Sequence, residues 1–586
     1  MASAVGHHAV TLADDTWHHV HAPGLRGAVI IGPGQQSDGP ALLRWLDRKC
    51  DGAPPLRQGF LAVLLRSDGS VDAAVSCRRE IALFYALDAG RLVLAPSLRA
   101  LIDALPAPPP LSIAKLADLL VLEDAPDTTV CEGARRLPLG HRLAWRRGQA
   151  QPSVHRWFDP SQSSFRGVGV REAAGVMRET VRAAVEASLP DDGSAAATLS
   201  GGLDSSMVTA TAASLLSASG RSLPTVTHVP LAGAGYQRPN WEADDGPYAR
   251  RMAADVPGLV WSPIVNDDRV LPLDAAISAF PSLGMPVLNP ANQVWLNAIT
   301  SWAADRDVAV MLAGFSGNAS FSRARDGILA ELLNERRLGA VVRQVARRWR
   351  AGDSRLTALR SVARETAPEW VIRAGRRMRQ SDPMRDASDR LAQSMPVVRD
   401  SLSAAGRERL ERWSRPPSVR GTRQHWEDLL LGDWSLSVQT LRPGVWWSDP
   451  LSDQEVLELA WQLPAEAWVR NGLDRGLARD AAAGLVPDYI RLRRTRGAQS
   501  ADVGLWIAGR EQRYRDEIDR FRGSSLVHEF LDVDRLERSL ARGLPSGDDA
   551  MGWEMTFGRA FGFGLFAVWY EEEILKPARR RASTAR

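Results

Sequence analysis

The residues best suited to chemistry form one uninterrupted run, Ser200-Gly201-Gly202-Leu203-Asp204-Ser205-Ser206. The two glycines allow a tight turn that exposes successive backbone N–H groups, and a helix that starts there adds its positive dipole end. The serine hydroxyls supply further donors, and Asp204 can hold a magnesium ion that neutralises phosphate charge. The run therefore predicts a site for the phosphates of a nucleotide.

The residues on either side of this run supply the elements that must position it. Residues 195–199 (AAATL) are typical of a short buried strand, and residues 207–216 (MVTATAASLL) can form a helix. The plainer alternative is a glycine turn closed by an ordinary helix cap. A strand before the run and a helix after it favour nucleotide binding.

The surrounding chain repeats this strand and helix pattern. The apolar runs PTVTHVPL (224–231) and VAVMLAG (308–314) follow helical stretches, which predicts a parallel sheet covered by helices, with ligands at the carboxyl ends of its strands. Beyond residue 335 the pattern is mainly helical. An arginine-rich stretch at 335–380 is most simply a solvated helical face.

The first part of the chain has a different pattern. Between residues 58 and 160 short apolar runs alternate with turn signals, which predicts an antiparallel, strand-rich region with helices near 98–105 and 112–122. The polar residues 161–170 are typical of a linker. The fold class is therefore α/β overall, with an α+β front part.

Length and composition set the outer limits. A chain of 586 residues and 64.0 kDa is expected to form two or more domains. The net charge of +4 gives no indication of a nucleic acid partner. No apolar run is long enough for a transmembrane segment, and the start MASAVGHHAV is no secretory signal, so a cytoplasmic location is expected. The only lysines, Lys49, Lys115 and Lys576, exclude a Walker P-loop and a pyridoxal Schiff base.

The run at 200–206 resembles the signature loop of the asparagine-synthetase family of ATP pyrophosphatases. The resemblance implies that ATP and Mg²⁺ are used, that the loop grips pyrophosphate, and that a substrate carboxylate attacks the α-phosphorus before an amine displaces AMP. It places Leu199 and His228 beside the adenine. It also implies an inactive Ntn-glutaminase-like sandwich domain over residues 1–165. A PP-loop ATP-pyrophosphatase domain would follow over 166–586, with an Arg- and Trp-rich helical insertion at about 335–420.

A second turn, Ala313-Gly314-Phe315-Ser316-Gly317-Asn318-Ala319, resembles the glycine-rich turn of the same family. The resemblance implies nucleotide contacts for Ala313, Gly314, Ser316 and Gly317. Asn318 stands where an acidic magnesium ligand is expected, so Asp204 and Asn318 are the implied metal ligands. An amide oxygen coordinates magnesium more weakly and without charge. Phe315 stands where asparagine synthetases carry a glutamate.

Two later segments extend the resemblance. Residues 494–497 (RTRG) occupy the place of the family's Arg-Pro-Lys element, which implies that Arg496 contacts the reacting phosphate and, with Asp204, is catalytic. A guanidinium keeps its proton, so Arg496 could not donate one. Arg475 and Arg479 lie in a segment similar to the family's arginine-containing helix. Surface or ion-pair roles are the alternative for each of these arginines.

The front domain resembles a glutaminase that lacks its nucleophile. That activity needs a cysteine directly after the initiator methionine, where this chain has Ala2, and Cys50, Cys77 and Cys131 are all internal. The favoured interpretation is that the amine comes with the substrate, as in β-lactam synthetases and lasso peptide macrolactam cyclases. Ammonia-dependent amidation is the alternative, and it leaves the front domain no role except as a scaffold. The GFSGNAS turn, the segment TRGAQSAD (495–502) and the helical insertion are more similar to the cyclases.

A lasso cyclase would adenylate an Asp or Glu side chain of a precursor core peptide and close the ring with the peptide's N-terminal amine. The expected partners are that peptide and the leader-binding and leader-peptidase proteins of the same pathway. A non-catalytic ATP-binding scaffold is a further alternative. Trp434, Trp446, Trp447 and Trp461 could line a peptide-sized pocket, although core positions are the favoured interpretation.

Overall fold

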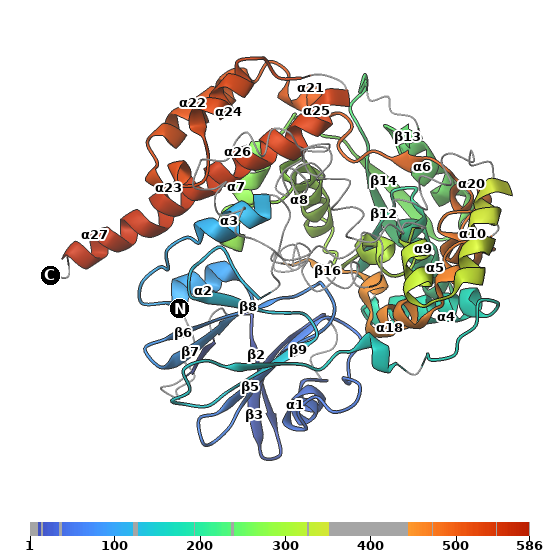
Figure 1. Ribbon diagram of the computed structural model, residues 1–586, viewed down its shortest axis with the longest axis horizontal. Coiled ribbons are helices and arrows are strands. Elements are labelled where there is room, and N and C mark those ends of the chain that lie inside the picture. The colour runs from blue at the N-terminus through green and yellow to red at the C-terminus, as the bar shows by residue number, and fades with distance from the viewer. Residues whose placement is uncertain are drawn as a thin grey trace.

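The computed structural model describes residues 10–12, 16–33, 38–120, 127–163, 165–192, 194–235, 240–324, 327–350, 423, 444–470, 473–545 and 548–584. Ala2, Trp434 and most of the predicted helical insertion lie outside these ranges. Figure 1 shows strand-rich and helix-rich regions lying against each other. Among the described helices, none combines the length and apolar character needed to cross a bilayer.

The front part of the chain is built from two sheets packed face to face. The larger has the order β10-β9-β5-β4-β3-β2, all antiparallel, and comprises β2 (His18–Ala22), β3 (Leu25–Ile31), β4 (Phe60–Leu65), β5 (Val71–Val75), β9 (His141–Trp145) and β10 (Ser153–Arg156). The smaller has the order β1-β7-β6-β8 and comprises β1 (Val10–Leu12), β6 (Leu83–Asp88), β7 (Arg91–Ala95) and β8 (Ala134–Leu137). The strand-rich region predicted from the sequence is thus present.

Alternation along the strands determines which residues fill which layer. In β4, Leu61 and Val63 face the smaller sheet, whereas Ala62 and Leu64 face α1 (Gly39–Asp47). On the other side, α2 (Leu98–Ala104) and α3 (Ile113–Leu120) cover the outer face of β6 and β7, within a residue or two of the predicted helices. The front part therefore has four layers: helix, sheet, sheet, helix.

The second part of the chain contains the predicted parallel sheet. Its order is β14-β12-β11-β15-β16, with β11 (Ala195–Thr198), β12 (Leu223–His228), β14 (Leu259–Ile264), β15 (Val310–Leu312) and β16 (Trp446–Ser448). One face is covered by α4 (Ala173–Ser188), α5 (Leu203–Ser217) and α6 (Gly246–Asp255), and the other by α8 (Pro290–Ala304). The carboxyl ends of β11, β12 and β15 therefore open onto a common edge.

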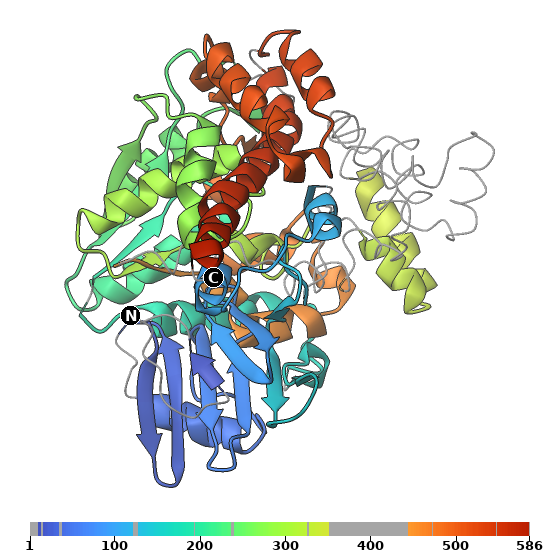
Figure 2. The ribbon, with the colours of Figure 1, turned by 90° about the vertical axis from the view of Figure 1, so that its left-hand side faces the viewer.

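Helices make up most of the remaining described chain. They are α7 (Pro272–Leu283), α9 (Ile328–Asn334), α10 (Leu338–Arg350), α18 (Gln454–Gln462), α19 (Gly476–Ala481), α20 (Asp488–Arg491), α21 (Val503–Ile507), α22 (Glu511–Arg522), α23 (Ser525–His528), α24 (Val533–Leu540), α25 (Asp548–Trp553), α26 (Arg559–Trp569) and α27 (Lys576–Thr584). Two π-helical turns, η6 (Glu554–Gly558) and η7 (Tyr570–Leu575), flank α26. This long C-terminal element extends towards the front part, where α26 packs with α3 and α7 in one core (Figure 2).

Buried tryptophans stabilise the sheet. Trp447 is fully buried in β16 among the side chains of α8, and Trp446 points into the core on the opposite face. Trp461 is partly buried on α18. Trp446 and Trp447 are thus core aromatics, as the favoured interpretation has it.

Candidate active site

The glycine turn at the end of β11 has the shape that a phosphate-binding loop requires. Gly201 has φ +63°, and a Cβ on it would lie 2.7 Å from Cβ of Tyr248. Gly202 is extended and α5 begins at Leu203, so the dipole of this helix points into the turn. Ser205 Oγ lies 2.8 Å from Ser200 Oγ and accepts from the backbone N–H of Ser200 at 3.2 Å. These bonds fix the loop before any ligand arrives.

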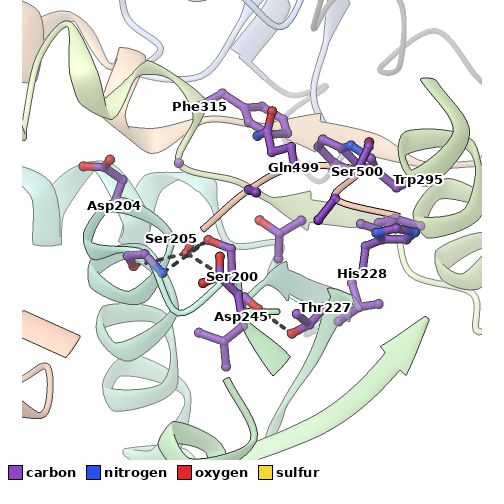
Figure 3. Close-up of a pocket in the computed structure, with 18 of the residues that line it drawn as sticks. Ser200, Asp204, Ser205, Thr227, His228, Asp245, Trp295, Phe315, Gln499 and Ser500 are labelled. Carbon is purple, nitrogen blue, oxygen red and sulfur yellow. Dashed lines mark hydrogen bonds between the residues drawn. The ribbon is translucent and has the colours of Figure 1, made fainter. Parts of the chain in front are cut away.

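A cavity of about 280 Å³ lies against this loop. Figure 3 shows that Asp204 and His228 stand at opposite ends, with Ser200 and Ser205 between them. The predicted site residues that line it are Leu199, Ser200, Gly202, Leu203, Asp204, Ser205, His228, Gly314 and Asn318. The fold thus gathers residues from the ends of β11, β12 and β15 into one pocket.

Other predicted site residues are placed around this pocket rather than in its wall. Gly201 shapes the loop, Ser206 is buried within α5 and Ala313 is part of the core. Ser316 and Gly317 are buried in the turn η3 (Phe315–Asn318), between Gly314 and Asn318 in the sequence. Arg496 is exposed on the short strand β17 (Arg496–Gly497), which pairs with β13 (Trp241–Glu242). The role predicted for Arg496 at the reacting phosphate stays a prediction.

The second glycine turn packs directly onto Asp204. A Cβ on Gly317 would lie 2.3 Å from Cγ of Asp204, and one on Gly314 would lie 2.9 Å from its carbonyl carbon. Burial raises the pKa of the Asp204 carboxyl, and the guanidinium of Arg475 opposes that rise. Oδ1 of Asp204 is buried and has no hydrogen-bond partner in the described chain. Such an unpaired oxygen indicates that this carboxylate is shaped for a ligand.

Arg475 lies between the two residues implied as magnesium ligands. Its Nη2 donates to Oδ1 of Asn318 at 2.8 Å, and its Nη1 lies 3.9 Å from Oδ2 of Asp204. Across the described ranges, no group of three or more His, Cys, Asp or Glu side chains could hold a metal ion. These donors do not fit a magnesium ion shared by Asp204 and Asn318, because an arginine uses the amide oxygen. The carboxylate of Asp204, which lines the pocket, is the acidic group that could meet a cation arriving with phosphates.

The opposite end of the pocket holds two unpaired polar groups. Burial lowers the pKa of His228 to about 4, so its ring is neutral at physiological pH. Among the described residues its buried Nε2 has no hydrogen-bond partner, and its ring lies T-shaped to that of Trp506, with the ring centres 5.9 Å apart. Asp502 accepts from the backbone N–H of Leu231 through Oδ2 at 2.8 Å, while its buried Oδ1 has no hydrogen-bond partner in the part of the chain that the structure describes. These atoms are suited to the polar edge of a base.

A buried arginine supports the loop from one side. Nη1 of Arg493 donates to Oδ1 of Asp245 at 2.7 Å and lies 3.4 Å from the carbonyl oxygen of Gly201. Its guanidinium stacks 3.9 Å from the centre of the Tyr248 ring. Burial raises the pKa of Asp245 to about 6, although Arg493 lowers it in part. Asp245 therefore changes charge just below neutral pH.

Sequence reasoning did not assign roles to Asp245, Arg493 or Asp502, and it named Arg475 only as part of a similar helix. Asp502 ends the segment TRGAQSAD, and Arg493 directly precedes the RTRG element. The sequence indicates both segments, but without a regular periodicity a loop does not show which of its side chains point into the protein. The inward positions became apparent only from the packed chain.

Two comparisons bear on this site. The family model described as asparagine synthase matches residues 176–556, which contain the parallel sheet, both glycine turns, Arg475, Arg493 and Asp502. A search among curated proteins found no match. The region that builds the pocket is therefore the region that matches the family.

Proposed function

Because the chain belongs to the asparagine synthase family, in which ATP drives amide bond formation, we propose that it adenylates a carboxylate and joins it to an amine of the same substrate. The observation that carries this proposal is the pocket itself. It has a phosphate-type loop in its middle and the carboxylate of Asp204 at one end. At the other end it has polar atoms with no hydrogen-bond partner among the described residues. Its elongated arrangement suits a nucleoside triphosphate.

The proposed orientation follows from charge and hydrogen-bonding capacity. The N-terminus of α5, which begins at Leu203, favours the phosphates, and Arg475 adds positive charge beside Asp204. The base then lies towards His228 and Asp502, where the N6 amine of adenine can donate to the free oxygen of Asp502. Leu199 would lie beside the adenine. Trp295 and Phe315 give the adjoining wall an apolar character.

The proposed reaction has two steps. In the first, an oxygen of the substrate carboxylate bonds to the α-phosphorus, the bond from that phosphorus to the bridging oxygen breaks, and pyrophosphate leaves. In the second, the amine nitrogen bonds to the acyl carbon, AMP leaves with the carbon–oxygen bond electrons, and the nitrogen loses a proton. Arg475 and the loop stabilise the developing phosphate charge, while the pocket orients the reactants.

The burial of the three cysteines supports the hypothesis that the amine comes with the substrate. All three are buried, and burial raises the pKa of Cys50 and Cys131 to about 12 and that of Cys77 well above its usual value. The reactive form of cysteine is the thiolate, which such burial disfavours. These side chains are therefore unsuited to releasing ammonia from an amide, and Ala2 has no nucleophilic group.

The finer proposal is a lasso peptide cyclase. The substrate would be a precursor core peptide whose Asp or Glu side chain is adenylated and whose N-terminal amine closes a macrolactam. Phe315 supports a substrate other than free aspartate, because it puts an aromatic ring where asparagine synthetases have a glutamate. Leader-binding and leader-peptidase proteins would prepare the peptide. An ATP-binding scaffold is the second candidate, because Arg475 uses the oxygen of Asn318 expected to bind magnesium.

The test is to incubate the full chain with ATP, Mg²⁺ and a candidate core peptide. We expect AMP and pyrophosphate in equal amounts and a product lighter than the peptide by one water. An N-acetylated peptide should still exchange labelled pyrophosphate into ATP but give no ring. Absence of nucleotide cleavage with every candidate peptide would favour the scaffold, and turnover of small β-amino acids would favour a β-lactam synthetase.

A further inference from the structure

A buried polar network joins the front sheets to the parallel sheet. Glu80 and Arg78 form an ion pair in the front part, and their side chains are 0% and 1% exposed. Oε1 of Glu80 accepts from the backbone N–H of Asp449 and from Oγ of Ser448, both at 2.9 Å. Nη2 of Arg78 donates to Oγ of Ser448 at 3.0 Å. The end of β16 is therefore held by side chains of the front part.

The same network reaches the second glycine turn. Nη1 of Arg79 donates to Oγ of Ser316 at 3.2 Å. The backbone N–H of Ser316 donates to Oδ2 of Asp449 at 2.7 Å, and Oδ1 of Asp449 accepts from the N–H of Leu451 at 3.2 Å. Asp449 is fully buried, and burial raises its pKa to about 6 while Ser316 and Arg79 oppose that rise. Ser316 is thus held at both its backbone and its side chain.

The next two residues of this turn touch the nucleotide end of the pocket. Gly317 packs against the carboxyl group of Asp204, and Asn318 accepts from Arg475. Ser316, Gly317 and Asn318 are consecutive in one short 3₁₀ turn, so a shift of the first residue moves the other two. One continuous set of contacts therefore leads from Arg79 and Glu80 to Asp204 and Arg475.

We propose that the front domain is a positioning element for the active site: Arg79, directly, and Glu80, through Asp449, hold the Phe315–Asn318 turn so that Asp204 and Arg475 face the phosphates. This gives a domain without a catalytic cysteine a role in the ATP reaction. Its effect on turnover rests on the function proposed above. Small displacements of groups that stabilise developing charge are costly to catalysis, so loosening the turn should slow turnover without unfolding the protein.

Hydrogen–deuterium exchange of the full chain tests the structural part without any substrate. In Arg79→Ala, we expect the backbone N–H of Ser316 to exchange about tenfold faster, because the loss of one hydrogen bond loosens the turn locally. Arg79→Lys, which keeps a donor, should restore much of the protection. Arg66→Gln is the matched control, since Arg66 pairs with Asp47 and Asp72 inside the front part.

Turnover is then measured on the same variants. With an active wild type, Arg79→Ala should lower the rate of pyrophosphate release about tenfold, and Arg66→Gln should leave it unchanged. Wild-type levels of both exchange and turnover in Arg79→Ala would overturn the inference, as would equal loosening of the turn in Arg66→Gln. An inactive wild type would refute the proposed function alone, because faster exchange at Ser316 would still support the positioning contact.

Discussion

At the scale of single residues, the site is defined by buried polar atoms that have no hydrogen-bond partner among the residues described by the structure. Oδ1 of Asp204, Nε2 of His228 and Oδ1 of Asp502 are of this kind, and all three residues line one pocket. Leaving such atoms unpaired costs roughly 1–3 kcal/mol each. A bound nucleotide that pairs them recovers this cost, which links stability to binding.

Asp204 gives the sharpest prediction at this scale. Asp204→Asn keeps the shape of the side chain but removes its charge, so the alignment of the phosphates with Arg475 should be lost. We expect pyrophosphate release to fall roughly a hundredfold, by analogy with the removal of a single group that stabilises the transition state. Release is measured with a coupled pyrophosphate assay. Ser219→Ala, beyond the other end of α5, is the control, and a rate for Asp204→Asn within threefold of wild type contradicts the assignment.

Asp502 gives a prediction about the base. ATP should bind about tenfold more tightly than purine riboside triphosphate, which lacks the N6 amine, because that amine donates to Oδ1 of Asp502. In Asp502→Ala the two nucleotides should bind equally, while Asp502→Asn, which keeps an acceptor, should retain part of the preference. Titration calorimetry measures the affinities. An undiminished preference for ATP in Asp502→Ala places the base elsewhere.

At the scale of elements, the close packing of the two glycine turns explains why residue 317 is a glycine although it does not line the pocket. Gly317 lies against the Asp204 carboxyl so closely that a Cβ would be 2.3 Å from Cγ. Gly317→Ala should therefore displace the turn or Asp204 and lower pyrophosphate release at least tenfold. Gly175→Ala on α4 is the matched control, since its Cβ would meet nothing within 4 Å. It should leave activity intact and raise helix stability slightly. Equal activity of the two variants contradicts this packing argument.

The π-helical turn η6 contains a buried carboxyl group whose effect on stability depends on pH. Burial raises the pKa of Glu554 from 4.5 to about 8, although Arg559 opposes the rise, and both carboxyl oxygens are unpaired in the described chain. Because the folded pKa is above the unfolded one, Glu554 contributes most stability below pH 4.5, and this contribution is lost as pH rises through about 8.

Glu554→Gln should remove this dependence, because glutamine stays neutral. The melting temperature of the wild type relative to that of the variant should fall steadily between pH 5 and pH 8. The corresponding loss in the free energy of unfolding is a few kcal/mol, at about 1.4 kcal/mol per pKa unit. Differential scanning calorimetry across this range measures the difference. A constant difference at every pH would show that Glu554 titrates normally.

At the scale of the whole molecule, the two parts of the chain share their cores and their polar contacts. One hydrophobic cluster includes strands of the front sheets together with α4 and α5, and another joins α2 and α3 to α7 and α26. The ion pair of Arg78 with Glu80 is buried where the front part meets the end of β16. We therefore expect the front part and the parallel-sheet part to unfold together.

Glu80→Ala tests this expectation. Removing Glu80 takes away the closer carboxylate partner of the buried Arg78 and leaves Asp453, 3.9 Å from its Nη1. Breaking a buried ion pair in this way typically costs about 3–5 kcal/mol. The melting temperature should fall in one transition that includes both parts, followed by calorimetry and by near-ultraviolet circular dichroism. Glu132→Ala, an exposed front-part residue, should change little. A separate early transition of the front sheets would contradict the shared core.

The sequence by itself determined the features that depend on neighbours along the chain. The strand, glycine turn and helix around residues 200–206 follow from local periodicity and backbone freedom, and so do α2, α3 and the alternating strands of the front part. Only the tertiary structure decided which side chains face the pocket. Arg475 and Asp502 line it and come from segments distant from the loop at 200–206, while Arg496, assigned by its place in a motif, is exposed. The strand β16 joined the sheet although more than 130 residues separate it from β15. The physical reason is that local hydrogen bonds form between near neighbours, whereas burial and charge pairing depend on which distant surfaces meet.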